Sequence, residues 1–156
     1  MKQEAPCTGL PDAVVDASVG IKLFVAEEMS EQAELLFASM ANDRPVRLYV
    51  PDLFYVECTN ILWKYVRRHG LPAEQAHANL SDLSALSLQA VPTVEIVQEA
   101  LEIVIGFGAT AYDACYVALS YRLGAYLITA DERLVRQFAG SRYRIRWLGD
   151  IRPNSD

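Results

Sequence analysis

The chain has 156 residues, of which 52% are hydrophobic and 22% charged. A chain of this length is expected to form one domain that buries roughly 70% of its unfolded surface, so stability requires no disulfide or metal staple. Fourteen Lys and Arg against twenty Asp and Glu give a net charge of −6. This acidic balance argues against broad electrostatic binding to nucleic acid, but it leaves room for a local, metal-mediated site.

The cysteines and the absence of apolar runs indicate the compartment. Cys7, Cys58 and Cys115 are odd in number and widely spaced, so neither a disulfide framework nor a zinc ribbon is indicated. Cys58 and Cys115 fall within helical patterns, and we expect both to be buried as small hydrophobic residues. The N-terminus has no signal-peptide core, and no run approaches the ~18 apolar residues of a membrane span. We therefore expect a cytoplasmic protein without membrane contact.

Short apolar runs typical of strands alternate with longer segments of helical periodicity. Strands are predicted over residues 13–15, 47–50, 88–91, 125–128 and 142–147. Helices are predicted over residues 18–26, 30–40, 53–69, 73–85, 94–105, 111–123 and 131–138. This alternation predicts an α/β fold, a three-layer α/β/α sandwich around a mostly parallel sheet. We expect a single domain over residues 11–152, with a flexible extension over 1–10 and a loose tail over 153–156.

The first half of the chain supplies two acidic side chains near strand ends. Asp16 directly follows the first strand, and Ser30 is expected to cap the helix over 30–40. The helix after the second strand has an apolar stripe, and Glu57, Asn60 and Lys64 follow an adjacent stripe at i, i+3 and i+7. A solvated helix flank would explain that polar stripe. The position of Glu57, between two apolar residues and early in the helix, favours a functional role.

The second half supplies two more acidic side chains. Thr110 and Asp113 have the spacing of a capping box, and Asp131 is placed to cap the last helix. Taken alone, each acid is explained by capping. The helix over 94–105 has one apolar side, made by Val94, Val97, Leu101 and Ile105, and ends at Gly106 and Gly108. The last strand alternates Arg142, Arg144 and Arg146 with Tyr143, Ile145 and Trp147, as a half-buried strand does.

Four carboxylates thus stand at comparable places, near the carboxyl edge expected of a parallel sheet: Asp16, Glu57, Asp113 and Asp131. Two like charges ~4 Å apart repel by roughly 4 kcal/mol at an effective dielectric of 20, so such a cluster needs a counter-ion. Oxygen-rich sites suit hard cations such as Mg²⁺ or Mn²⁺. Two such ions ~4 Å apart can activate a water and stabilise the leaving oxygen of a phosphodiester.

Four motifs in this order resemble the PIN-domain ribonucleases, and within them the VapC-type toxins of bacterial toxin–antitoxin pairs. The resemblance spans residues 13 to 147 and depends on VVDASV, PDLFYVECTNILWK, AYDACYVALS and LITADERL. Each motif is weak alone, because short acidic motifs occur by chance. Together they carry Asp16, Glu57, Asp113 and Asp131 in the order and at the elements of the family.

The resemblance implies a sheet with strand order 3-2-1-4-5, whose topological switch point lies between the first and fourth strands. It implies hydrolysis of RNA at an acidic Mg²⁺ or Mn²⁺ site, in which Asp16, Glu57, Asp113 and Asp131 are catalytic. Asp16, Asp113 and Asp131 would ligate metal. Ser18, Asn60 and Thr129 would support the site, and Lys64 would contact the substrate. It further implies a homodimer and a cognate antitoxin protein that inhibits the enzyme.

Other interpretations remain open at this point. A PIN-like module that binds RNA or protein without catalysis would keep the same fold. A phosphatase with Asp16 as nucleophile would want a second acid two residues later, where Ser18 stands. Lys64 apart, the basic residues near 67 and those of the last strand are best explained by helix-end and edge-strand effects. His69 and His77 are expected at the surface.

Overall fold

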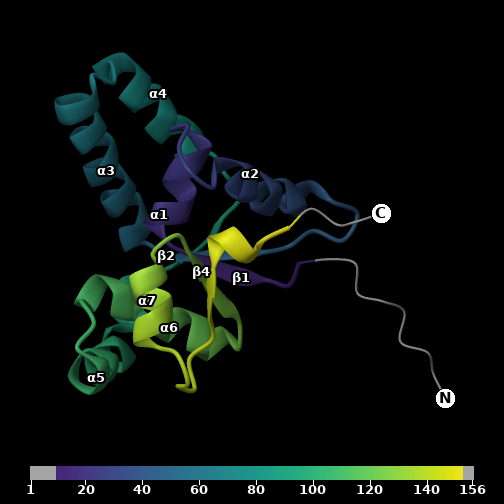
Figure 1. Ribbon diagram of the computed structural model, residues 1–156, viewed down its shortest axis with the longest axis vertical. Helices are drawn as coiled ribbons and strands as arrows, with labels where there is room; N and C mark the ends of the chain where they lie inside the picture. Colours follow the sequence, from purple (N-terminus) through teal and green to yellow (C-terminus); the bar gives the residue numbers. More distant parts are fainter. Residues whose placement is uncertain (1–9, 153–156) are drawn as a thin grey trace.

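The computed structural model describes residues 10–152 (Figure 1). Five strands form one sheet in the order β3-β2-β1-β4-β5, and all four pairings are parallel. The predicted fold class and strand order are confirmed. The strands are β1 Ala13–Val15, β2 Leu48–Pro51, β3 Gln89–Val91, β4 Tyr126–Thr129 and β5 Ile145–Trp147.

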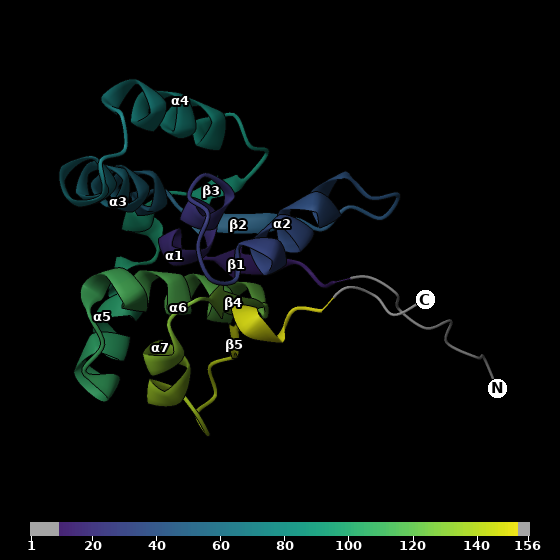
Figure 2. The same ribbon diagram turned by 45° about the horizontal axis from the view of Figure 1, so that its top comes forward.

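Seven helices connect these strands within the described residues. They are α1 Ala17–Gly20, α2 Ser30–Ala38, α3 Leu53–His69, α4 Ala73–Ser84, α5 Val97–Phe107, α6 Ala111–Leu123 and α7 Glu132–Gln137. Helices α3 and α4 lie beside the β2 and β3 end of the sheet (Figure 2). Helix α6 packs across β2, β1 and β4, α7 packs on β4 and β5, and α5 packs on α6. The predicted extension over 1–10 and tail over 153–156 lie outside the described residues, except for Leu10, which packs against the core.

The core is continuous through the sheet and the helices that cover it. Strands β1 and β4 run through its centre, where Val14 and Leu127 are fully buried. Helix α6 contributes seven consecutive buried residues, Ala114 to Ser120. Cys58 and Cys115 are buried, as expected. No single helix between residues 10 and 152 has the length and composition to cross a membrane; α5 and α6 meet that test only as a pair, bent by 114°.

The segment over 18–26 is shorter as a helix than predicted. Helix α1 ends at Gly20 and continues as one 3₁₀ turn, Ile21–Leu23. Here α1 presses on α3 so closely that a Cβ on Gly20 would lie 2.6 Å from the Cζ of Phe54. The loop that follows is held by the buried Lys22, whose ammonium pairs with Glu27 at 3.0 Å.

The prediction that Ser30 caps α2 is wrong. Met29 occupies the cap position with a left-handed backbone, φ 66°, and Ser30 is the first helical residue. The Ser30 hydroxyl accepts a hydrogen bond from the Glu27 amide and donates one to the Val25 carbonyl. The preceding loop therefore takes up the hydroxyl that a cap would have used.

The apolar side predicted for the helix over 94–105 faces outward. Val94 and Ile105 are 78% and 77% exposed and Leu101 is 56% exposed, while the core receives Ile96, Ala100 and Ile103 instead. The apolar arc of this helix, opposite Gln98, Glu99 and Glu102, is wider than the part the core buries, so periodicity alone does not identify the buried side chains. Gly106 lies within α5, and Gly108, with φ 67°, ends it.

Candidate acidic active site

The acidic residues meet at the carboxyl edge of the sheet. Strands β1 and β4 are adjacent and parallel, with Val15 opposite Ile128, so both strands end at the same edge. Asp16 follows β1 directly, and Asp131 follows β4 after one residue. This edge is the switch point of the sheet, where the chain leaves toward β2 on one side and β5 on the other.

Asp16 is buried and held by local donors. It is the N-cap of α1, and its Oδ1 accepts a hydrogen bond from the Val19 amide at 3.2 Å and one from the Ser18 hydroxyl at 2.5 Å. The Ser18 Oγ in turn accepts a hydrogen bond from the Ala130 amide at 3.0 Å. Ser18 therefore ties the end of β1 to the loop after β4.

Thr129 and Asp131 form the β4 side of the edge. Thr129 is fully buried, and its Oγ1 accepts a hydrogen bond from the Asp131 amide at 3.1 Å. Asp131 caps α7, as predicted, by accepting from the Arg133 amide at 2.9 Å. Its second oxygen lies 3.3 Å from the Arg133 guanidinium.

Asp113 and Glu57 approach from two helices. Asp113 lies in the first turn of α6, where the Thr110 Oγ1 accepts a hydrogen bond from the Asp113 amide at 3.1 Å, so the predicted cap is present. Glu57 lies in the second turn of α3 and is only partly exposed. The Tyr116 hydroxyl of α6 donates a hydrogen bond to Glu57 Oε1 at 2.6 Å.

Burial and mutual repulsion raise the pKa of three of these acids. Burial raises the pKa of Asp16 from 3.8 to about 6; hydrogen bonds from Ser18 and Thr129 oppose the shift, and the charge of Asp113 adds to it. The pKa of Glu57 is raised by burial first and by Asp113 as well, against the Tyr116 hydrogen bond. The pKa of Asp113 is raised by burial and by Asp131, and is lowered by Thr110 and Arg133. Asp113 is therefore electrostatically linked to the other three acids.

The donor set suits a hard divalent cation, because every group is a carboxylate or hydroxyl oxygen. No three His, Cys, Asp or Glu side chains of residues 10–152 converge closely enough to enclose an ion as they stand. Carboxylates that repel one another settle apart, and a bound cation would remove the repulsion that separates them. The residues therefore fit a divalent metal that draws the acids together on binding.

Two predicted site residues lie outside this edge. Asn60 and Lys64 are exposed on α3, one and two turns beyond Glu57, and neither makes a side-chain hydrogen bond within the described chain. His69 and His77 are both exposed, as expected of surface residues. Only Glu57 of the polar stripe on α3 therefore reaches the other acids.

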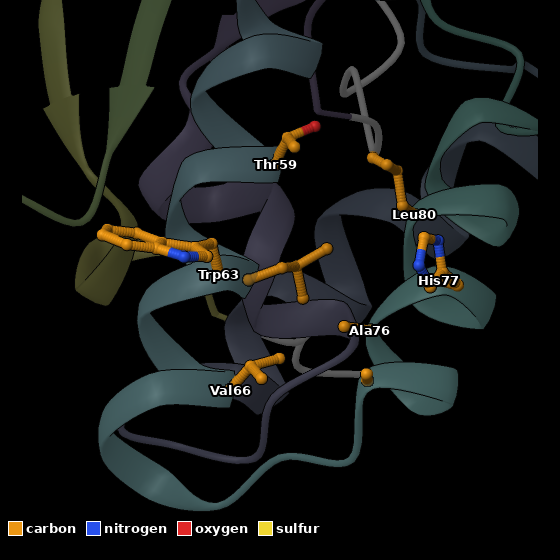
Figure 3. A pocket seen from close by; sticks show the side chains of 8 residues that line it. Thr59, Trp63, Val66, Ala76, His77 and Leu80 are labelled. Carbon is orange, nitrogen blue, oxygen red and sulfur yellow. The ribbon is translucent and has the colours of Figure 1, made fainter.

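An apolar groove on the other side of α3 is separate from the acids. It lies between α3 and α4, has a volume of about 270 Å³ and is lined by residues such as Leu62, Val66, Ala76 and Leu80. Figure 3 shows these two helices flanking it, with His77 the titratable side chain at its wall. Without a carboxylate in its wall, the groove offers no ligand for a hard cation.

Tyr116 was not identified from the sequence, although a signal for it exists. It follows Asp113 by three residues in a helix, so both side chains leave the same face of α6. Its aromatic ring also fits an ordinary core position, and the residue is in fact 1% exposed. Periodicity predicts that burial but not the polar contact made by the hydroxyl.

The family model of the PIN domain matches residues 13–139, and the chain belongs to the PIN-domain family. Within that family its relatives by sequence are VapC ribonucleases. The chain is 37% identical over 127 residues to Ribonuclease VapC3 of Pyrobaculum aerophilum, a match that covers 80% of this chain and 93% of that protein. The resemblance predicted from the four motifs is confirmed.

Solved structures agree with the fold. The structure of Mycobacterium tuberculosis VapC20, described as a sarcin–ricin loop cleaving toxin, matches with a TM-score of 0.63 at 17% identity, over 83% of this chain and 96% of that one. A chain of a toxin–antitoxin complex from Klebsiella pneumoniae matches with a TM-score of 0.58 at 18% identity, over 83% and 92%. At these identities the two structures support the fold alone.

Proposed function

We propose that this chain is a ribonuclease toxin that hydrolyses RNA phosphodiester bonds at the acidic edge, with Mg²⁺ or Mn²⁺ as cofactor. One observation carries the proposal: four acids from separate elements of the chain lie close enough to interact electrostatically. The charge of Asp113 raises the pKa of Asp16 and of Glu57, and the charge of Asp131 raises the pKa of Asp113. Folding alone gives no reason to gather like charges in this way, whereas a cation site requires it. The sequence relationship to VapC ribonucleases supplies the reaction class.

Each site residue has a role that follows from its place. Asp16, Asp113 and Asp131 would hold the metal, since they stand at the strand ends and at the start of α6. A bound divalent ion supplies positive charge for the phosphodiester and a water of lowered pKa. Glu57 faces Asp113 across α3 and α6. Ser18 and Thr129 hold Asp16 and the Asp131 backbone in place, as supporting groups do around metal ligands.

The substrate would approach along α3. Lys64 is an exposed cation on the helix that carries Glu57, and Asn60 is an exposed amide one turn before it. Both are therefore free to contact an RNA backbone next to the acids. The chain has a net charge of −6, so we expect bound metal, and not the protein surface as a whole, to supply most of the attraction for a polyanion.

We propose two protein partners. The matching Klebsiella pneumoniae structure is a toxin–antitoxin complex, which supports a cognate antitoxin as the first partner, one that would inhibit this chain. A second copy of the chain would bind the outer face of α5, which is defined by Val97, Leu101 and Ile105 together with Val94 of the preceding 3₁₀ turn, Thr93–Glu95. These four apolar side chains are exposed on one stretch of the chain, and a contiguous apolar surface of this kind is typical of protein contacts.

The enzyme is tested with purified, antitoxin-free protein and a single-stranded RNA, with and without Mn²⁺. We expect cleavage that needs the metal and is lost in Asp113→Asn. The matched control is Asp82→Asn, an exposed acid on α4, a helix that carries none of the four acids. Undiminished cleavage by Asp113→Asn, or cleavage in excess chelator, would contradict the proposal. RNA binding without any cleavage or metal binding would favour a non-catalytic PIN-like module instead.

A further inference from the structure

The four acids differ in how their side chains are held. Asp16 and Asp131 each cap a helix and accept a hydrogen bond from a backbone amide two or three residues later. Glu57 lies in the second turn of α3, where nearby amides already bond to carbonyls of the preceding turn. No local donor is free for Glu57, so its orientation depends on a group from another element.

Tyr116 is that group. The residue is 1% exposed in the core, so the position of the hydroxyl is fixed by packing. The hydroxyl donates to Glu57 Oε1 at 2.6 Å, and within the described chain this is the one hydrogen bond made by the Glu57 side chain. Glu57 Oε2 has no donor among residues 10–152 and is available to a ligand.

The hydrogen bond from Tyr116 opposes the electrostatic repulsion between Glu57 and Asp113. Asp113 and Tyr116 are three residues apart on α6, so the face that presents the hydroxyl to Glu57 also presents a second negative charge. Without the hydroxyl, that charge would drive the flexible Glu57 side chain toward solvent. The Tyr116 hydroxyl thus keeps two repelling carboxylates beside each other.

We propose that Tyr116 is a positioning residue of the acidic site, which holds Glu57 toward Asp113 so that Glu57 joins the binding of a divalent cation. This inference rests on the proposed metal-dependent function. Tyr116 touches neither metal nor RNA, and it acts only through Glu57.

A second hydrogen bond from a tyrosine to a glutamate, made by Tyr65 of α3, provides a matched control. The Tyr65 hydroxyl donates to Glu27 Oε2, also at 2.6 Å, and links α3 to the loop before α2. That glutamate pairs with Lys22 and lies on a different element from the acidic edge. Tyr65→Phe therefore removes a Tyr–Glu hydrogen bond of the same length, at a more exposed position, without touching the site.

The test is a double-mutant cycle on Mn²⁺ affinity, measured by titration calorimetry of metal-free protein, with RNA cleavage measured in parallel. We expect Tyr116→Phe to weaken Mn²⁺ binding and lower kcat by roughly 10-fold, the scale for groups that support metal ligands. In a Glu57→Ala background the same change should alter Mn²⁺ affinity by less than about 2-fold, because the group it positions is gone. Tyr65→Phe should keep the wild-type affinity.

The outcomes separate this inference from the proposed function. An equal loss of affinity from Tyr116→Phe with and without Glu57 would assign it a general packing role and overturn the inference. Unchanged Mn²⁺ affinity in Tyr116→Phe would overturn it as well, even if the wild type cleaves RNA. The expected pattern of Mn²⁺ affinities, in a wild type that cleaves no RNA, would support the positioning role and overturn the ribonuclease.

Discussion

Two regions of this molecule depart from what folding favours, and they do so in opposite ways. The acidic edge places negative charges in partly or fully buried positions beside one another. The outer face of α5 places apolar side chains in water, although the same helix packs closely on α6 through Ile103 and Ala100. The first arrangement costs electrostatic free energy, and the second forgoes hydrophobic burial.

The difference indicates what each region binds. A bound cation reduces the repulsion between buried like charges, and contact with another protein surface removes exposed apolar groups from water. Both regions share helix α6 as their support: its first turn carries Asp113, and α5 packs against it after a bend of 114°. A ligand at either region should therefore stabilise the fold, and a substitution there should remove binding before it removes structure.

The largest expected effect is on catalysis at the acidic edge. Asp16→Asn and Asp113→Asn should each lower RNA cleavage by more than about 100-fold, beyond what loss of a merely supporting group produces. In metal-free protein Asp113→Asn should raise the melting temperature, because it removes the charge that the other acids feel. Cleavage assays and thermal melts in chelator check both. A lower melting temperature for Asp113→Asn would show that the carboxylate contributes more through its contacts than it costs through repulsion.

The pH dependence of stability is the next effect. The folded-state pKa of Asp16 is raised from 3.8 to about 6, so the folded state binds more protons than the unfolded state between these values. This group therefore stabilises the metal-free protein below pH ~4, and about 3 kcal/mol is lost as the pH rises to ~6. Denaturant unfolding at pH 4.5 and pH 7 should show a difference of about 2 kcal/mol, because part of the loss has already occurred by pH 4.5.

Two controls sharpen the pH experiment. Asp16→Asn should flatten the dependence, because the titrating group is removed. Saturating Mn²⁺ should reverse the trend, since metal binding requires the ionised carboxylate. An unchanged pH slope in Asp16→Asn would assign the dependence to other groups.

A charge placed on the outer face of α5 tests whether this face forms the proposed dimer interface. Ile105→Glu should shift the protein from dimer to monomer in sedimentation experiments, while its melting temperature at low concentration stays within a few degrees of wild type. Glu74→Ala changes charge at an exposed position of α4 and should leave the dimer intact. A dimer that persists in Ile105→Glu would place the interface elsewhere.

The smallest expected effect concerns Arg133, the positively charged side chain beside the acids. Arg133 pairs with Asp131 and Arg136 with Glu132 on the same short helix, and both guanidinium side chains are 73% exposed. Each pair should contribute less than about 1 kcal/mol. Without metal, Arg133→Gln should lower the free energy of unfolding slightly more than Arg136→Gln, because Arg133 also counters the charge of Asp113. Equal losses of unfolding free energy in the two variants, measured by chemical denaturation, would show that Arg133 does not interact with Asp113.

Asp16 and Asp131 could be predicted at the sheet edge because strand ends are marked locally, whereas Glu57 and Asp113 lie early in helices and the strand order was implied by the family resemblance. Asp16 and Asp131 each follow a short apolar run, and parallel strands end at one edge whatever the details of packing. The outward face of α5 was not predictable in this way. Gln98, Glu99 and Glu102 mark a polar side, but the apolar arc on the rest of the helix is wider than the part that the core buries, and periodicity does not say which part that is. The Tyr116 contact was missed because it joins residues 59 positions apart, a separation that no local pattern spans.

The close contact between Gly20 and Phe54 sets the geometry of the acidic edge from a distance. Phe54 stands one turn before Glu57 on α3, and Gly20 stands one turn after Asp16 at the end of α1. A methyl group at residue 20 would overlap the Phe54 ring, so α1 and α3 pack this closely only because residue 20 has no side chain. Gly20→Ala would push α1 and α3 apart, and we expect it to increase the distance between the Asp16 and Glu57 carboxylates without altering any charged group.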